Sequence, residues 1–238
     1  SIQKREFKTQ TGTYKGKRIT VLSTGIGTGN IDIVLNELDA LVNIDLEKRT
    51  LKEHPKSLKI IRIGTSGSLQ PDIPVDTFVI STHALDLNGM LHFYKIDGIT
   101  NPLLEEAFIK HTQWSSNKAK PIVINNSNEL EKLFESKQTF KGMTATKGGF
   151  YGPQGRVLRL AIEDPYLNNK MDSFNYNGIR ISNLEMETSA IYGLSKLLGH
   201  QALSLNAIIA NRANGTFSKN PDMVVEKLIK YTLDKLVD

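Results

Sequence analysis

The 238-residue sequence is 39% hydrophobic, enough to bury the core of one domain, and its lack of cysteine excludes disulfides, thiolate zinc sites and a cysteine nucleophile. Its net charge of +5 reflects 30 Lys and Arg against 25 Asp and Glu. The basic residues are spread along the chain without a basic run rich in aromatics, so a small anionic substrate fits as well as nucleic acid. No apolar run approaches the roughly 20 residues that a membrane span needs and no signal peptide opens the chain, so we expect a cytoplasmic protein without a membrane or nucleic-acid partner.

The chain opens with a predicted hairpin and a glycine-rich turn. The hairpin strands are expected at Phe7–Thr13 and Arg18–Ser23, and a helix is expected at Ile31–Leu41. The glycines between them stand at positions 25, 27 and 29, so the dinucleotide fingerprint fails at Asn30 and no P-loop Lys follows. This disfavours an NAD-binding protein. It leaves open either a close backbone approach to an anion or ribose, or a plain strand–helix turn.

An arginine interrupts the next apolar strand. Leu58–Ile63 is β-branched and apolar except for Arg62, and a loop is predicted at Gly64–Ser68. A buried arginine is unfavourable unless it is paired. Beside glycines and the hydroxyl of Thr65, a phosphate is its natural partner, because the guanidinium fork binds two oxygens. The alternative is an internal carboxylate.

Strands then alternate with helices to the end of the chain. We expect strands at Val75–Ser81, Pro121–Asn125, Ile179–Leu184 and Ala202–Ala210, and helices at Asn101–Trp114, Asn128–Phe134, Pro165–Phe174, Thr188–Gly199 and Met223–Leu236. This alternation predicts an α/β fold: a single domain over residues 1–238 with a central mixed, largely parallel twisted β-sheet flanked by helices on both faces.

Two further stretches carry candidate ligands. In the loop that begins at Phe150, Gln154 and Arg156 stand two residues apart and could converge on a planar ligand, where a carboxamide suits the O2/N3 edge of a pyrimidine. The alternative is an ordinary surface loop. In Asn183–Leu194, Glu185 and Glu187 share a face if the backbone is extended and would suit the hydroxyls of a ribose. They could equally be acids favoured by the dipole of the helix that follows.

Together these stretches resemble the nucleoside phosphorylase superfamily, and specifically its uridine phosphorylase branch. The matching motifs run in the family's order along nearly the whole chain: STGIG at Ser23–Gly27, RIGTSG at Arg62–Gly67, FYGPQGR at Phe150–Arg156, LEMET at Leu184–Thr188 and IANR at Ile209–Arg212. The branch assignment depends mainly on the Gln154-x-Arg156 pair.

The resemblance implies a role for each matching residue. Phosphate would be held by Arg62, Gly64, Thr65 and, from a neighbouring subunit, Arg5. Ribose would be held by Glu185, Met186, Glu187 and Thr65. The base would be held by Phe150, Gln154, Arg156, Arg212, Ile208 and Ile209, and the residues acting in catalysis would be Arg62, Glu187 and Arg156. Glu6 matches a position near a monovalent cation, but Asn30 departs from the usual serine there, so no metal is expected.

The implied reaction is reversible phosphorolysis of uridine to uracil and ribose 1-phosphate in pyrimidine salvage, and the sequence leaves open whether deoxyuridine or thymidine is also a substrate. Inorganic phosphate is the co-substrate, no cofactor is implied, and the protein would be a homo-oligomer, a dimer or hexamer. Alternatives are a purine nucleoside phosphorylase, a hydrolytic nucleosidase or a non-catalytic nucleoside-binding homologue. The family's N-terminal strand and glycine–arginine phosphate loop precede the KREF segment at Lys4–Phe7, and we expect this chain to lack them and so to be less than fully active.

Overall fold

The computed structural model describes residues 1–237. The helices are α1 (Thr28–Asn43), α2 (Pro102–Thr112), α3 (Asn128–Phe134), α4 (Leu167–Asp172), α5 (Thr188–Leu197) and α6 (Pro221–Val237), with short 3₁₀ turns η1 (Met90–Phe93) and η2 (Gly152–Gln154). The strands are β1 (Ile2–Lys4), β2 (Phe7–Tyr14), β3 (Lys17–Leu22), β4 (Ile44–Asp45), β5 (Thr50–Leu51), β6 (Lys59–Ser68), β7 (Phe78–Asp86), β8 (Ile122–Asn125), β9 (Thr139–Thr146), β10 (Asn175–Tyr176), β11 (Ile179–Glu185), β12 (Gln201–Asn211) and β13 (Thr216–Phe217).

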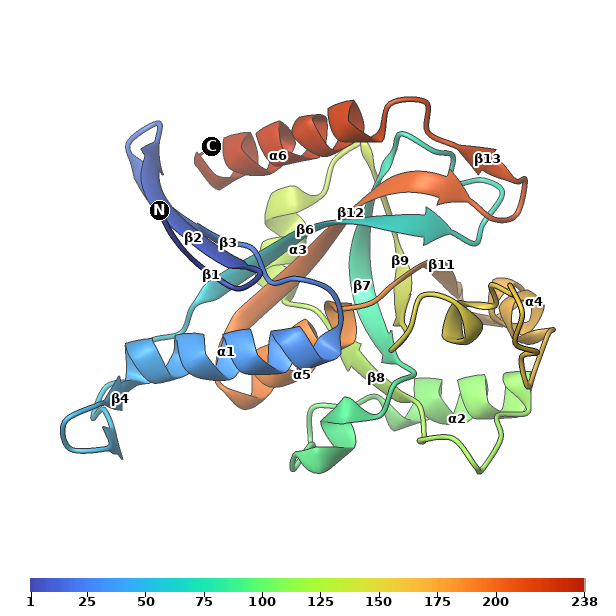
Figure 1. Ribbon diagram of the computed structural model, residues 1–238, viewed down its shortest axis with the longest axis horizontal. Coiled ribbons are helices and arrows are strands. Elements are labelled where there is room, and N and C mark those ends of the chain that lie inside the picture. Colours follow the sequence, from blue (N-terminus) through green and yellow to red (C-terminus); the bar gives the residue numbers. More distant parts are fainter. Residues whose placement is uncertain (238) are drawn as a thin grey trace.

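The expected α/β architecture is confirmed. The main sheet has the order β13-β12-β6-β11-β9-β7-β8, with parallel pairing of β12 to β6, β11 to β9 and β7 to β9 and antiparallel pairing elsewhere. It is more curled than an open sheet, because β12 also pairs with β7 through Leu205–Ala207 and closes a ring of strands. Helices lie on both sides of this curled sheet (Figure 1).

Three buried apolar clusters pack the helices against the sheet. One joins α1 and α5 to β7 and β8, a second joins α2 and α4 to β9 and β11, and a third joins α3 and α6 to β7 and β12. The predicted N-terminal hairpin is confirmed as β2 and β3, which lie beside the end of α6, where Tyr14 donates to Asp234 at 2.8 Å (Figure 1). None of the described helices is long and apolar enough to cross a membrane.

Two expectations about local structure are wrong. The stretch 64–68 is no loop: β6 continues through it, because Lys59–Ser68 pairs with β12 along its whole length and the ladder holds the glycines extended. The strand expected at Val75–Ser81 begins at Phe78 and runs on to Asp86, where β9 pairs with it in parallel. The short strands β1, β4, β5, β10 and β13 were not predicted. They have too few residues to show a period.

Candidate functional site

Arg62 lies at the centre of a buried polar cluster on β6. Its Nη2 group is 2.6 Å from Glu187 Oε2 and 3.1 Å from Glu185 Oε2, and its Nη1 group donates to Asn206 Oδ1 at 2.9 Å. Burial lowers the pKa of Arg62, but the attraction of the two carboxylates outweighs this and raises the pKa above its ordinary value. Internal carboxylates are thus partners of this arginine, as one of the two sequence-based alternatives proposed.

Both glutamates contact the Arg62 guanidinium, but they differ in how many other hydrogen bonds their carboxylates accept and in how exposed they are. Glu185 Oε1 accepts from the Thr146 hydroxyl at 2.6 Å, and its Oε2 accepts the backbone N–H groups of Glu187 and Thr188, each at 2.9 Å. These last bonds satisfy the first free N–H groups of α5, so Glu185 acts as a cap of that helix. The side chain of Glu185 is 1% exposed and that of Glu187 10% exposed, which leaves Glu187 as the more accessible carboxylate.

The glycine turn before α1 closes on the same cluster. Gly27 donates its backbone N–H to Glu187 Oε1 at 2.7 Å and has a φ of 91°. A residue with a side chain is strained at this φ, so glycine is needed for the backbone to present its N–H here. The turn therefore approaches a carboxylate of the protein itself.

The loop after β9 builds a second polar cluster around Gln154. Its Oε1 accepts from Arg156 Nη1 at 2.6 Å and from Arg212 Nη2 at 3.1 Å, and Arg212 Nη1 also donates to the Gln154 backbone carbonyl at 2.7 Å. Arg156 Cζ lies 3.7 Å from the centroid of the Phe150 ring. The structure thus brings together four of the six residues that the resemblance assigned to the base.

Arg156 and Arg212 share the Gln154 Oε1 acceptor, and neither pairs with a carboxylate in the described part of the chain, so this cluster is positive. Burial lowers the pKa of Arg212 to about 10, and repulsion from Arg156 adds to the effect. Both remain charged at neutral pH. Because the Gln154 oxygen faces both guanidiniums, its Nε2 amide is left as a donor, with no hydrogen bond to the described part of the chain.

The remaining predicted site residues belong to neither of these two polar clusters. Thr65, Arg5 and Glu6 are exposed, the last two in the turn between β1 and β2, and Met186 and Ile209 are partly buried. Ile208 is fully buried in a cluster with Ile73 and Val79, so its side chain faces the core. Within residues 1–237, no group of three His, Asp or Glu side chains could hold a metal ion.

The residues that hydrogen-bond to Arg62 and Glu185, and so help to fix their positions, were not identified from the sequence. Ser204 and Asn206 on β12 support Arg62, and Thr146 at the end of β9 supports Glu185. A signal was available for Ser204 and Asn206, because polar side chains alternate with apolar ones inside an otherwise buried strand. Lys147, which directly follows β9, was also not identified as a candidate, although it is 2% exposed.

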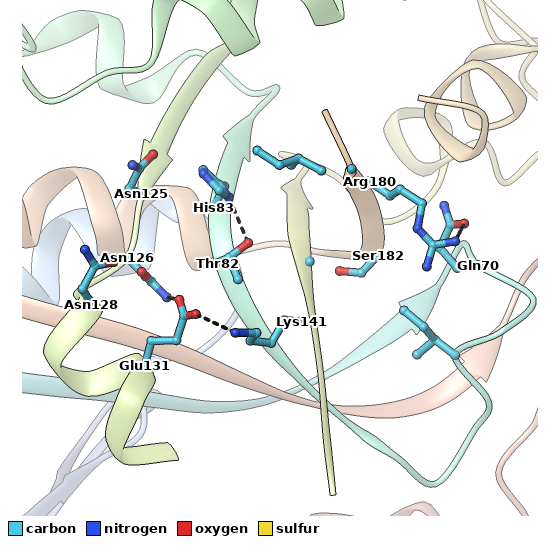
Figure 2. A pocket seen from close by; sticks show the side chains of 14 residues that line it. Gln70, Thr82, His83, Asn125, Asn126, Asn128, Glu131, Lys141, Arg180 and Ser182 are labelled. Atoms are coloured by element: carbon cyan, nitrogen blue, oxygen red, sulfur yellow. Dashed lines mark hydrogen bonds and ion pairs between the residues drawn. The ribbon is translucent and has the colours of Figure 1, made fainter. Parts of the chain in front are cut away.

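A separate hollow of about 430 Å³ lies toward the beginning of β9 and β11, away from the strand ends that carry the candidate residues. Figure 2 shows its polar lining, in which Glu131 reaches both Asn126 and Lys141 while His83 bonds Thr82. None of the predicted site residues lines it.

Comparison with known proteins gives consistent matches along the chain. The family model described as "Phosphorylase superfamily" matches residues 1–236. The uridine phosphorylase of Thermococcus kodakarensis is 28% identical over 221 residues, which is 90% of this chain and 66% of that protein. The uridine phosphorylase of Haemophilus influenzae is 28% identical over 233 residues, or 98% of this chain and 77% of that protein.

A DeoD-type purine nucleoside phosphorylase of Bacillus thuringiensis is 27% identical, covering 95% of this chain and 79% of that protein. Among solved structures, a Trypanosoma brucei nucleoside phosphorylase described as showing uridine phosphorylase activity aligns with a TM-score of 0.85 at 29% identity, over 98% of this chain and 84% of that chain.

Proposed function

The chain belongs to the phosphorylase superfamily, and we propose that it catalyses the reversible phosphorolysis of uridine to uracil and ribose 1-phosphate. The observation that carries this proposal is the Gln154 carboxamide, whose oxygen is held by Arg156 and Arg212. With its oxygen held by two guanidiniums, this carboxamide presents its Nε2 group as a donor, which is suited to a carbonyl oxygen of a uracil ring.

In this proposal Gln154 and Arg156 bind the polar edge of the base, and Phe150, which is 51% exposed, packs against the nucleoside. Arg212 holds Gln154 in place. When the bond from C1′ to N1 breaks, its electron pair stays on the uracil ring. Two guanidiniums set beforehand around that ring stabilise the negative charge as it forms.

Glu187 is proposed to accept the ribose hydroxyls. Its carboxylate is held by Gly27 and Arg62, so it is oriented before the sugar binds. The oxygens of Glu185 are taken up by Thr146, Arg62 and the start of α5, which favours a positioning role for this residue. Its bond to the Glu187 N–H holds the backbone that carries the ribose ligand.

Phosphate is proposed to bind beside Arg62, Gly64 and Thr65, with Arg5 supplied by a neighbouring subunit. Arg62 donates to Glu187 in this structure, so a phosphate that draws the guanidinium toward itself would release Glu187 for the ribose. The phosphate oxygen then forms the new bond to C1′ as the uracil departs. Holding both reactants in line supplies the positioning part of catalysis.

Purine nucleosides are the second candidate, because DeoD-type purine nucleoside phosphorylases are among the similar proteins. The chain after β12 reads Asn211–Arg212 and has no acid before Asp222, so no carboxyl group is placed there to protonate a purine ring. This favours the pyrimidine.

The proposal is tested by incubating the protein with uridine, deoxyuridine, thymidine and inosine, each with and without phosphate, and measuring the released base. We expect uracil release from uridine that depends on phosphate, and a loss of kcat/KM on the order of 10²-fold in Arg156→Ala. Release of hypoxanthine alone would favour the purine branch. Equal release without phosphate would show a hydrolase, and uridine binding with no release would show a non-catalytic homologue.

A further inference from the structure

Lys147 is a buried amine to which the mechanism above gives no part. The residue is 2% exposed, and its Nζ atom is buried with no hydrogen-bond partner among the residues that the structure describes. A buried ammonium without a partner is strongly unfavourable. A buried group of this kind points to a functional role or to a partner such as a ligand, an ion or a water.

The sheet places Lys147 on the face that carries the base-binding residues. Ala145 and Leu184 are paired across β9 and β11 and face the same apolar cluster. Lys147 follows Ala145 by two residues, Met186 follows Leu184 by two, and the Lys147 N–H bond to the Glu185 carbonyl at 3.0 Å continues the ladder. Because strand side chains alternate, Lys147 and Met186 emerge side by side.

Arg212 lies over that same face. Gly67 on β6 is paired with Leu184, and a Cβ atom on Gly67 would lie 3.5 Å from Arg212 Nε. Arg212 in turn holds Gln154. The proposed base readers and Lys147 therefore share one face of the sheet at the ends of β9 and β11.

The charged groups around Lys147 do not neutralise its ammonium group. The charged groups that act on it are Arg212, Lys118 and Asp164, of which two are positive. Asp164 is already engaged, because its carboxylate accepts from Lys170 Nζ at 2.9 Å and from the Tyr166 N–H at 3.0 Å. Burial, with repulsion from Arg212 and Lys118, lowers the pKa of Lys147 to about 7, so near neutral pH it can carry a proton whenever an anion is present.

We propose that Lys147 is an additional base-subsite residue, whose ammonium group faces the anion that the pyrimidine becomes as it leaves the ribose. This inference rests on the proposed function. In the reaction the C1′–N1 bond breaks with its electron pair on the ring, phosphate forms the new bond to C1′, and Lys147 keeps its proton while it pairs with the anion. Arg156 and Gln154 bind the polar edge of the ring, and Lys147 adds a third donor that is withdrawn from water.

The test compares leaving groups. Lys147→Met removes the charge with little change in volume, and 5-nitrouridine releases a base that is a stronger acid than uracil and needs less stabilisation. We expect Lys147→Met to lower kcat/KM for uridine on the order of 10²-fold and to lower kcat/KM for 5-nitrouridine much less. Lys118→Met is the matched control, because it removes a nearby positive charge from a partly exposed side chain that is paired with Glu163 at 3.2 Å. It should leave the ratio of the two substrates unchanged.

Equal losses for both substrates would show that Lys147 is only part of the packing, and unchanged kinetics would show that it does not meet the base. Either result overturns the inference while leaving uridine phosphorolysis intact. If the wild-type protein releases no uracil at all, the proposed function fails and the inference fails with it. Lys147→Gln, which is neutral but polar, must give the same ratio as Lys147→Met, so the test holds even if one variant folds poorly.

Discussion

Replacing Lys147 by Met is expected to make the folded protein more stable, the reverse of what most substitutions of buried residues do. Burial, followed by repulsion from Arg212 and Lys118, lowers the pKa of Lys147 from its ordinary value of 10.5 to about 7. In the unfolded chain the amine keeps its ordinary pKa, so the unfolded state binds more protons throughout the interval between these two values. Stability of the wild type therefore rises with pH across that interval.

The size of the effect follows from the two pKa values. Each unit of difference corresponds to about 1.4 kcal/mol, so the fall from 10.5 to about 7 gives an upper limit of about 5 kcal/mol for the destabilisation at and below neutral pH. Methionine has a similar length and no charge to desolvate, and it adapts to irregular apolar surroundings. The variant should therefore gain several kcal/mol near pH 7, and the gain should shrink by about 1.4 kcal/mol for each further pH unit.

The assay is denaturant unfolding of wild type and Lys147→Met at a series of pH values between about 7 and about 10. Lys118→Met serves as the control for the loss of a nearby positive charge. A gain in unfolding free energy that does not change with pH would refute the claim that the Lys147 amine is buried without a partner. A loss of stability would show that Lys147 is charged and paired in the folded protein.

Three further substitutions separate the roles of the Arg62 cluster. Glu187→Gln should lower kcat/KM for uridine on the order of 10²-fold while changing the unfolding free energy by no more than about 1 kcal/mol. Unchanged kinetics would remove Glu187 from the ribose site. Glu185→Gln should act mainly on stability, because α5 loses part of its cap. We expect the free energy of unfolding to fall by about 1–3 kcal/mol in denaturant unfolding, and a purely kinetic effect would contradict the capping role. Gly64→Ala should weaken phosphate binding, measured as the KM for phosphate, because the added Cβ would collide with the Arg62 guanidinium. An unchanged KM for phosphate would place the anion elsewhere.

The sequence predicted the fold class, the family and most helices and strands, because these depend on local periodicity and on short motifs. The helix at Asn128–Phe134 agrees with the structure to the residue, and the strand predicted at Ile179–Leu184 ends one residue later, at Glu185. The extension of β6 through Gly64 could not be foreseen, because two glycines normally favour a turn and only pairing with β12 overrides this.

The candidate site was foreseeable in its residues but less so in its contacts. Arg62 and Glu187 stood out as charged groups in apolar stretches, yet their pairing joins β6 to the start of α5, which are far apart in the chain. The residue pattern alone does not distinguish Glu185 from Glu187, and only the resemblance assigned catalysis to Glu187. The hydrogen bonds at the start of α5 add that Glu185 has more of its acceptor capacity already used. Lys147 carried no motif, and its isolation from hydrogen-bond partners is a property of the packed structure alone.

The central claim is that the ribose is transferred to phosphate, and the product tests it most directly. Uridine and inorganic phosphate are incubated with the protein, and the sugar product is identified by ³¹P NMR. The account predicts a ribose 1-phosphate signal that grows in proportion to the uracil released, and that reverses to uridine when uracil is added in excess. Uracil release accompanied by free ribose, with the phosphate signal unchanged, would contradict it.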